Sequence, residues 1–143
     1  MTILLVFLSV FIEYRRAKNN KLLKKHHIFK YKAVKKVASL IASKNGEKTI
    51  DLAVATARKN RYSVYVVSDG STDKTALVAK RAGAHVLQLR KNIGKPGALR
   101  RAYKHFQLSS RYDAIAILDD DVLIEKDFIL QCKKTMDRDC ALS

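Results

Sequence analysis

Residues typical of disulfide scaffolds, fibres and disordered chains are scarce in this sequence. Its 143 residues include one Pro, five Gly, two Cys and no Trp. Two cysteines are too few for a disulfide framework, and their spacing with the four histidines resembles no zinc motif. One Pro and five Gly argue against a collagen-like or disordered chain, whereas 48% of the residues are hydrophobic. The composition therefore predicts one globular domain with a core of its own.

The sequence also lacks, near its start, a hydrophobic run long enough to cross a bilayer alone. The run at residues 3–12 would extend about 15 Å as a helix, whereas the bilayer core is about 30 Å thick. No basic residue precedes the run and no small-residue cleavage site follows it, so a secretory signal is a poor match. Three interpretations remain: a short hydrophobic anchor, the cytoplasmic end of a membrane helix, or a helix packed on the domain.

Acidic residues are few, at 13 against 29 Lys and Arg, which gives a net charge of +16. Residues 1–36 hold ten of these basic residues and a single acidic one, a surplus of nine. Because the basic stretch directly follows the apolar run, residues 1–36 are predicted to be a membrane-proximal segment on the cytoplasmic face of a membrane. Nucleic acid is a less expected partner, because only Phe29 and Tyr31 interleave with the basic residues.

The remaining residues, 37–143, alternate short apolar strands with amphipathic helices. Strands are expected at residues 37–42, 64–68, 85–89 and 112–118, with helices between them. Three repeats of this alternation predict the α/β class, with right-handed crossovers and a doubly wound, mainly parallel sheet flanked by helices. The last strand is almost entirely apolar and is predicted to lie centrally, covered on both sides.

Four loops are expected to meet at the carboxyl edge of this sheet, where open α/β sheets bind ligands. Two of them carry carboxylates directly after a strand: Asp69 follows one, and residues 119–121 are three consecutive aspartates. Adjacent carboxylates repel one another unless water, a cation or a hydrogen-bonded ligand compensates them. This edge is therefore predicted to bind a nucleotide together with a divalent metal.

Individual residues at this edge suggest roles. Asp69 can accept hydrogen bonds from a base or ribose, although a turn or cap role is the plain alternative. Lys95 places a cation on a compact loop near the expected phosphates, but the chain has no Walker or Gly-x-Gly-x-x-Gly motif. Asp119 and Asp121 would project to one side of an extended segment and so could share Mg²⁺ or Mn²⁺.

Taken together, these residues resemble the family-two glycosyltransferases of the GT-A fold, especially their membrane-bound, cellulose-synthase-like branch. The resemblance runs from residue 37 to residue 129 and has four segments in the family's order. They are the first strand with its Asn-Glu turn (37–47), Asp-Gly-Ser-Thr-Asp-x-Thr (66–75), Gly-Lys-x-x-Ala-Leu (94–103) and the strand carrying Asp-x-Asp (113–128).

The resemblance implies a Rossmann-like nucleotide-binding fold and a role for each matched residue. Asp69 would contact the uracil ring, and Lys95 would help to hold the nucleotide. Asp119 would contact the nucleotide-sugar and the metal, and Asp121 would bind the metal. Glu47 would add a nucleotide contact, although the Pro of the family's first turn is absent from this chain.

By this resemblance, residues 37–143 are the donor-binding half of an enzyme, truncated before the acceptor half. The synthases continue into a Gln-x-x-Arg-Trp segment, whereas this chain has no Trp, and no catalytic residue is assigned. The expected function is transfer of a sugar from a UDP-sugar to a polysaccharide, lipid or other acceptor. The alternatives are a non-catalytic, membrane-attached nucleotide-binding fragment and a nucleotidyltransferase-like enzyme, whose Gly-rich, Arg-containing first loop is missing here.

Overall fold

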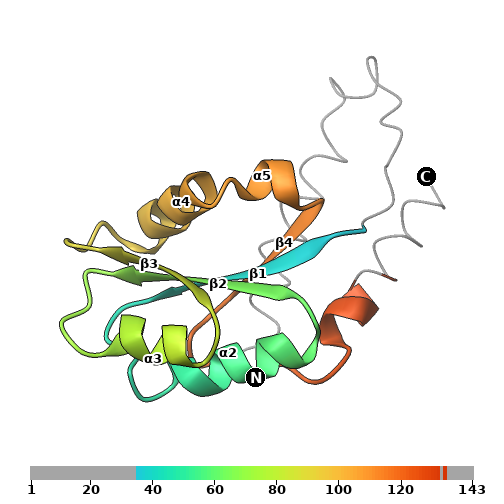
Figure 1. Ribbon diagram of the computed structural model, residues 1–143, viewed down its shortest axis with the longest axis horizontal. Coiled ribbons are helices and arrows are strands. Elements are labelled where there is room, and N and C mark those ends of the chain that lie inside the picture. The colour runs from blue at the N-terminus through green and yellow to red at the C-terminus, as the bar shows by residue number, and fades with distance from the viewer. Residues whose placement is uncertain (1–34, 133, 135–143) are drawn as a thin grey trace, which may run out of the picture. The chain divides into compact units, whose positions relative to one another are not determined.

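The computed structural model describes residues 35–132 and 134, which form a four-stranded sheet with helices on both faces (Figure 1). The elements follow one another as β1 (Val37–Ser43), α2 (Ile50–Lys59), β2 (Ser63–Asp69), α3 (Thr75–Arg81), β3 (His85–Leu89), α4 (Lys95–His105), α5 (Leu108–Arg111) and β4 (Ala114–Leu118).

The sheet order is β3-β2-β1-β4, and every pair of neighbouring strands is parallel. Helices α2 and α3 cover one face of the sheet, whereas α4 and α5 cover the other (Figure 1). Because the strands are parallel, the loops that follow them all leave from the same edge. The predicted doubly wound α/β sheet is therefore confirmed.

Two hydrophobic clusters hold the helices on the sheet. The cluster under α2 and α3 includes Ile50 and Val54, and the cluster under α4 and α5 includes Ala98 and Leu108. Neighbouring residues of β1 divide between them, since Ile41 packs in the first cluster and Leu40 in the second. This alternation is the side-chain period of a strand covered on both faces. Packing on both faces holds β1 in place, and the first loop of the candidate site follows this strand.

The prediction of a central last strand is wrong for the described residues. There, β4 pairs with β1 alone and lies at an edge of the sheet, and Ile117 is 46% exposed. Ala116 packs in the cluster under α2 and α3, whereas Ile115 packs in the cluster under α4 and α5. An edge strand between two helical layers has apolar residues on both sides, so its composition resembles that of a central strand.

The predicted membrane-proximal segment, residues 1–36, lies outside the described residues except for its last two. Of these, Lys35 and Lys36 donate their backbone N–H groups to a carboxylate oxygen of Asp113, at 3.0 and 2.9 Å. Among the described residues, no helix has both the length and the apolar character that crossing a bilayer requires.

Candidate functional site

The first two loops at the carboxyl edge are joined by hydrogen bonds between backbone and side chains. Asn45 N–H donates to Ser71 Oγ (3.1 Å), and Thr72 N–H donates back to Asn45 Oδ1 (2.9 Å). The N–H of Gly46, which is buried, donates to Thr75 Oγ1 at 2.9 Å. The Ser and Thr side chains after β2 therefore hold the loop after β1, so the two loops form one unit.

Glu47 and Asp73 extend this unit. Glu47 Oε2 accepts the N–H of Lys74 at 3.0 Å, and Asp73 Oδ2 accepts the N–H of Glu47 at 3.2 Å. Glu47 therefore stabilises the approach to α3 in this structure, and its predicted nucleotide contact stays a prediction.

Asp73 also stabilises the start of α3. Its Oδ1 accepts the N–H of Thr75 at 3.0 Å and the Thr75 hydroxyl. The hydroxyl bond is the main cause that lowers the pKa of Asp73 below its ordinary value of 3.8. Because the folded-state pKa is the lower one, this stabilisation is complete above pH 3.8 and is lost as the pH falls through the lowered value.

Asp69 joins the loop after β2 to the loop after β3. Its side chain is buried, with 4% exposure, and Oδ1 accepts the N–H of Ile93 at 2.8 Å. Its other oxygen, Oδ2, receives no hydrogen bond from the residues that the structure describes. Among the described residues, Ser39 Oγ is the one buried side-chain oxygen without a hydrogen-bond partner, so Asp69 Oδ2 is open to solvent and can accept the N–H of a bound base.

The same two loops approach so closely that only glycine fits at position 70. Gly70 has a φ of +66°, and a Cβ built on it would lie 2.7 Å from the carbonyl carbon of Lys91 and overlap the backbone nitrogen of Asn92. No side chain could move aside, because both obstacles are backbone atoms. The Asp-Gly pair thus provides the carboxylate at position 69 and the close contact between loops at position 70.

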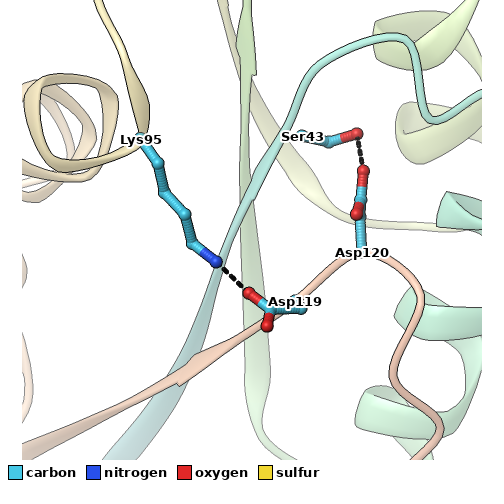
Figure 2. Close-up of polar contacts among 4 residues, drawn as sticks. All are labelled: Ser43, Lys95, Asp119 and Asp120. Carbon is cyan, nitrogen blue, oxygen red and sulfur yellow. Dashed lines mark hydrogen bonds and ion pairs between the residues drawn. The ribbon is translucent and has the colours of Figure 1, made fainter. Parts of the chain in front are cut away.

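Lys95 and Asp119 form an ion pair across the edge, between the start of α4 and the end of β4 (Figure 2). Gly94, with a φ of +79°, precedes α4, and Pro96 occupies the first turn of this helix. The side chains of Lys95 and Asp119 are 51% and 33% exposed. Ion pairs this exposed contribute about 0–1 kcal/mol, so a ligand can open the pair at little cost.

The three aspartates do not have the predicted alternate geometry. The expectation that Asp119 and Asp121 share one side of an extended segment is wrong, because β4 ends at Leu118 and a turn forms at Asp120 and Asp121. The N–H of Val122 closes this turn on the carbonyl of Asp119 at 3.4 Å. A metal at this edge would therefore depend on the turn and on ligand oxygens for its geometry.

Asp120, for which no role was predicted, contacts the first loop instead. Its carboxylate accepts the hydroxyl of Ser43 and points away from the Lys95–Asp119 pair (Figure 2). A Cβ on Gly46 would overlap both Ser43 Oγ and the Asp120 carboxylate. Gly46 thus leaves the space through which the loop after β4 contacts the loop after β1.

The Gly46→Ala variant is expected to break the Ser43–Asp120 hydrogen bond and to lower the free energy of unfolding by about 1 kcal/mol. The loss is small because Asp120 is half-buried and its carboxylate can turn into water. Urea unfolding of Gly46→Ala should be compared with the same change in a Ser43→Ala, Asp120→Ala background, where the cost should fall. An equal cost in both backgrounds would show that Gly46 acts independently of this contact.

The described residues contain no group of three or more His, Cys, Asp or Glu side chains that could hold a metal ion. The candidate ligands are thus two carboxylates, the half-exposed Asp119 and the exposed Asp121. Mg²⁺ is usually bound by one or two carboxylates, substrate phosphates and water rather than by an all-protein cage. The donor set therefore fits a hard divalent cation that binds together with a diphosphate.

The structure brings Asp69, Lys95 and the loop of three aspartates to one edge of the sheet. Glu47 makes hydrogen bonds to the residues before α3 instead. Sequence reasoning missed Ser43, Asp120 and the N–H of Ile93 as partners. The small residue Gly46, at which a Cβ would meet both Ser43 and Asp120, is the signal in the sequence that could have indicated a contact there. The binding roles of Glu47, Asp69, Lys95, Asp119 and Asp121 stay predictions.

Comparison with known proteins adds a family match in sequence and a fold match in structure. Residues 40–142 match the family described as glycosyl transferase family 2. No curated protein matches the chain. A crystal structure of a mycobacterial protein has a TM-score of 0.58 and 22% identity, over 71% of this chain and 36% of that one.

Other matching structures are of glucosyl-3-phosphoglycerate synthase from Mycobacterium tuberculosis, and two of its complexes serve as examples. The complex with Mn²⁺, UDP-glucose and phosphoglyceric acid has a TM-score of 0.54 and 21% identity, over 66% of this chain and 36% of the synthase. The complex with Mn²⁺, UDP and glucosyl-3-phosphoglycerate has a TM-score of 0.54 and 20% identity, over 74% and 44%. At these identities the matches establish the Rossmann-like GT-A fold alone, over less than half of each matched chain.

Proposed function

Because the chain belongs to glycosyl transferase family 2, we propose that it forms the donor-binding part of a glycosyltransferase that uses a UDP-sugar with Mg²⁺ or Mn²⁺. The observation that carries the proposal is the meeting, at one edge, of the Asp69 carboxylate with its unpaired oxygen and the Lys95–Asp119 pair. The synthase structures with UDP and Mn²⁺ support this choice of ligands.

The edge offers a separate group to each part of such a donor. Asp69 Oδ2 would accept the N3–H of uracil, while Oδ1 keeps the N–H of Ile93. Lys95 can exchange the Asp119 carboxylate for a phosphate oxygen, because their ion pair is open to water. Asp119 and Asp121 would hold the cation, which when bound supplies Lewis-acid stabilisation of the leaving diphosphate.

The remaining parts of the proposal rest on the sequence. The acceptor is a polysaccharide, lipid or other molecule that these residues do not identify. Assignment to the cellulose-synthase-like membrane branch, and association of residues 1–36 with the cytoplasmic face of a membrane, stay predictions. The family match favours a glycosyltransferase over a nucleotidyltransferase. The non-catalytic alternative predicts UDP binding without transfer of sugar.

Removing the metal is expected to weaken UDP binding about tenfold, which corresponds to about 1.4 kcal/mol. Calorimetric titration of the full chain with UDP, once in the presence of Mn²⁺ and once in the presence of EDTA, measures the difference. Asp121→Asn should abolish the gain from Mn²⁺, because the amide loses the charge that a hard cation prefers. Glu125→Gln, which changes an exposed carboxylate beyond the turn, is the matched control and should retain the gain.

The proposed function is wrong if ADP binds as tightly as UDP. If UDP binds selectively but with the same affinity in Mn²⁺ and in EDTA, the nucleotide site stands and the metal assignment is wrong. A radiolabelled UDP-sugar assay then distinguishes an enzyme from a binding fragment.

A further inference from the structure

A groove next to the proposed donor site runs between the edge strand β3 and helix α4. Its volume is about 1040 Å³, and its apolar lining comes from Leu87, Leu89 and Ile93. In the described sheet it lies at the edge opposite β4. The proposed function assigns no ligand to this groove.

The groove is strongly basic. Of the residues that the structure describes, those that line it include the exposed cations Arg90, Lys91, Arg100, Arg101 and Lys104, and no carboxylate. Within the described part of the chain, none of these five side chains makes a hydrogen bond or an ion pair. Five like charges along one groove repel one another, and an anionic partner would relieve that repulsion.

The strand that lines the groove also has an open edge. Among the described residues β3 pairs with β2 alone, so its outward backbone N–H and C=O groups have no partner strand. Along β3 the half-buried Leu87 and Leu89 flank the exposed Gln88. Such an edge can accept a further strand, whose backbone would satisfy these groups.

We propose that this groove binds an extended, acidic peptide segment of a partner protein, which adds to β3 as a strand and directs its carboxylates toward the cations of α4. Charge alone does not select this occupant, because a lipid headgroup or a nucleic acid would also neutralise the cations. Neither of these supplies the row of amide groups that completes a strand edge. Single-stranded nucleic acid is further disfavoured because its sites stack bases on aromatic rings, and His105 is the one ring that the described residues supply to the lining.

Fluorescence polarisation of the full chain tests the proposal with a labelled ten-residue peptide of alternating Glu and Val. The double variant Arg100→Glu, Arg101→Glu should weaken binding at least about tenfold, because both charges line the groove. The matched control, Lys80→Glu with Arg81→Glu, makes the same change of net charge on α3 and should have a much smaller effect. Circular dichroism should show that both double variants are folded.

A second probe separates strand addition from simple charge attraction. Two versions of the same peptide, N-methylated at every Glu or at every Val, keep its charge. Because alternate N–H groups point to opposite edges of a strand, the version without the donors that face β3 should bind at least about tenfold more weakly than the other. Equal binding of the two peptides, or equal weakening by the two double variants, would overturn the proposal. It would also be overturned if a single-stranded oligonucleotide or a phosphatidylserine vesicle bound more tightly than the peptide and depended on Arg100 and Arg101.

Discussion

Asp69→Asn is expected to bind UDP about tenfold to 150-fold more weakly than the unchanged chain, a loss of about 1.5–3 kcal/mol. The amide oxygen can still accept the N–H of Ile93, so the loops stay joined. The other position then holds an NH₂ group in place of the acceptor that the N3–H of uracil requires. The variant therefore removes the base contact without removing the contact between the loops.

The same variant should also change the preference between bases. Cytosine has an acceptor at N3, which the new NH₂ group can donate to, so the ratio of UDP to CDP affinity should fall. Calorimetry with both nucleotides measures the ratio. Asp51→Asn, at an exposed carboxylate on α2, serves as the control. An unchanged ratio in Asp69→Asn would remove Asp69 from base recognition while leaving its structural bond to Ile93 in place.

Gly70→Ala is expected to lower the free energy of unfolding by about 2–4 kcal/mol. Two costs add: an L-residue is strained at a φ of +66°, and the new methyl group overlaps the backbone at residues 91 and 92. Movement of that backbone would also displace the N–H of Ile93 from Asp69, so UDP affinity should fall as well. Urea unfolding and UDP titration measure the two effects.

Gly94→Ala separates strain from overlap. Gly94 also has a positive φ, of +79°, but a Cβ built there meets no atom within 4 Å. Its variant should therefore show backbone strain alone, about 1–3 kcal/mol, and the excess loss in Gly70→Ala measures the contact between the loops. If the two variants lose the same stability, the close approach at Gly70 is not required by the fold.

The elements of this fold could be predicted because their signals are local. Ile50, Ala53, Val54 and Ala57 recur three and four residues apart, a spacing that predicts one buried helix face, and all four are buried in α2. A glycine just after a helix predicts a left-handed end to that helix, and Gly83 after α3 has a φ of +93°. The position of β4 could not be predicted in this way, because a strand between two helical layers has the same composition at an edge as at the centre of a sheet.

Convergence of the four loops was predictable from topology, since parallel strands send their following loops to one edge. The contacts within that edge were not. The hydrogen bond of Ser43 to Asp120 joins residues 77 positions apart and depends on the space beside Gly46. The turn at residues 120–121 also depends on where β4 ends: side chains alternate only along an extended strand, and β4 ends at Leu118, before the first aspartate.

The place of β1 between β2 and β4 implies an order of folding. Ala38 pairs with Ser63, whereas Val37 pairs with Ala114, much farther along the chain. Pairings between nearby segments lose less chain entropy and close sooner, and the N-terminal part of a chain is synthesised first. The loops after β1, β2 and β3 are therefore expected to assemble before the aspartates after β4 arrive, so the protein would shape its nucleotide-facing edge before it gains the charges proposed to hold a metal.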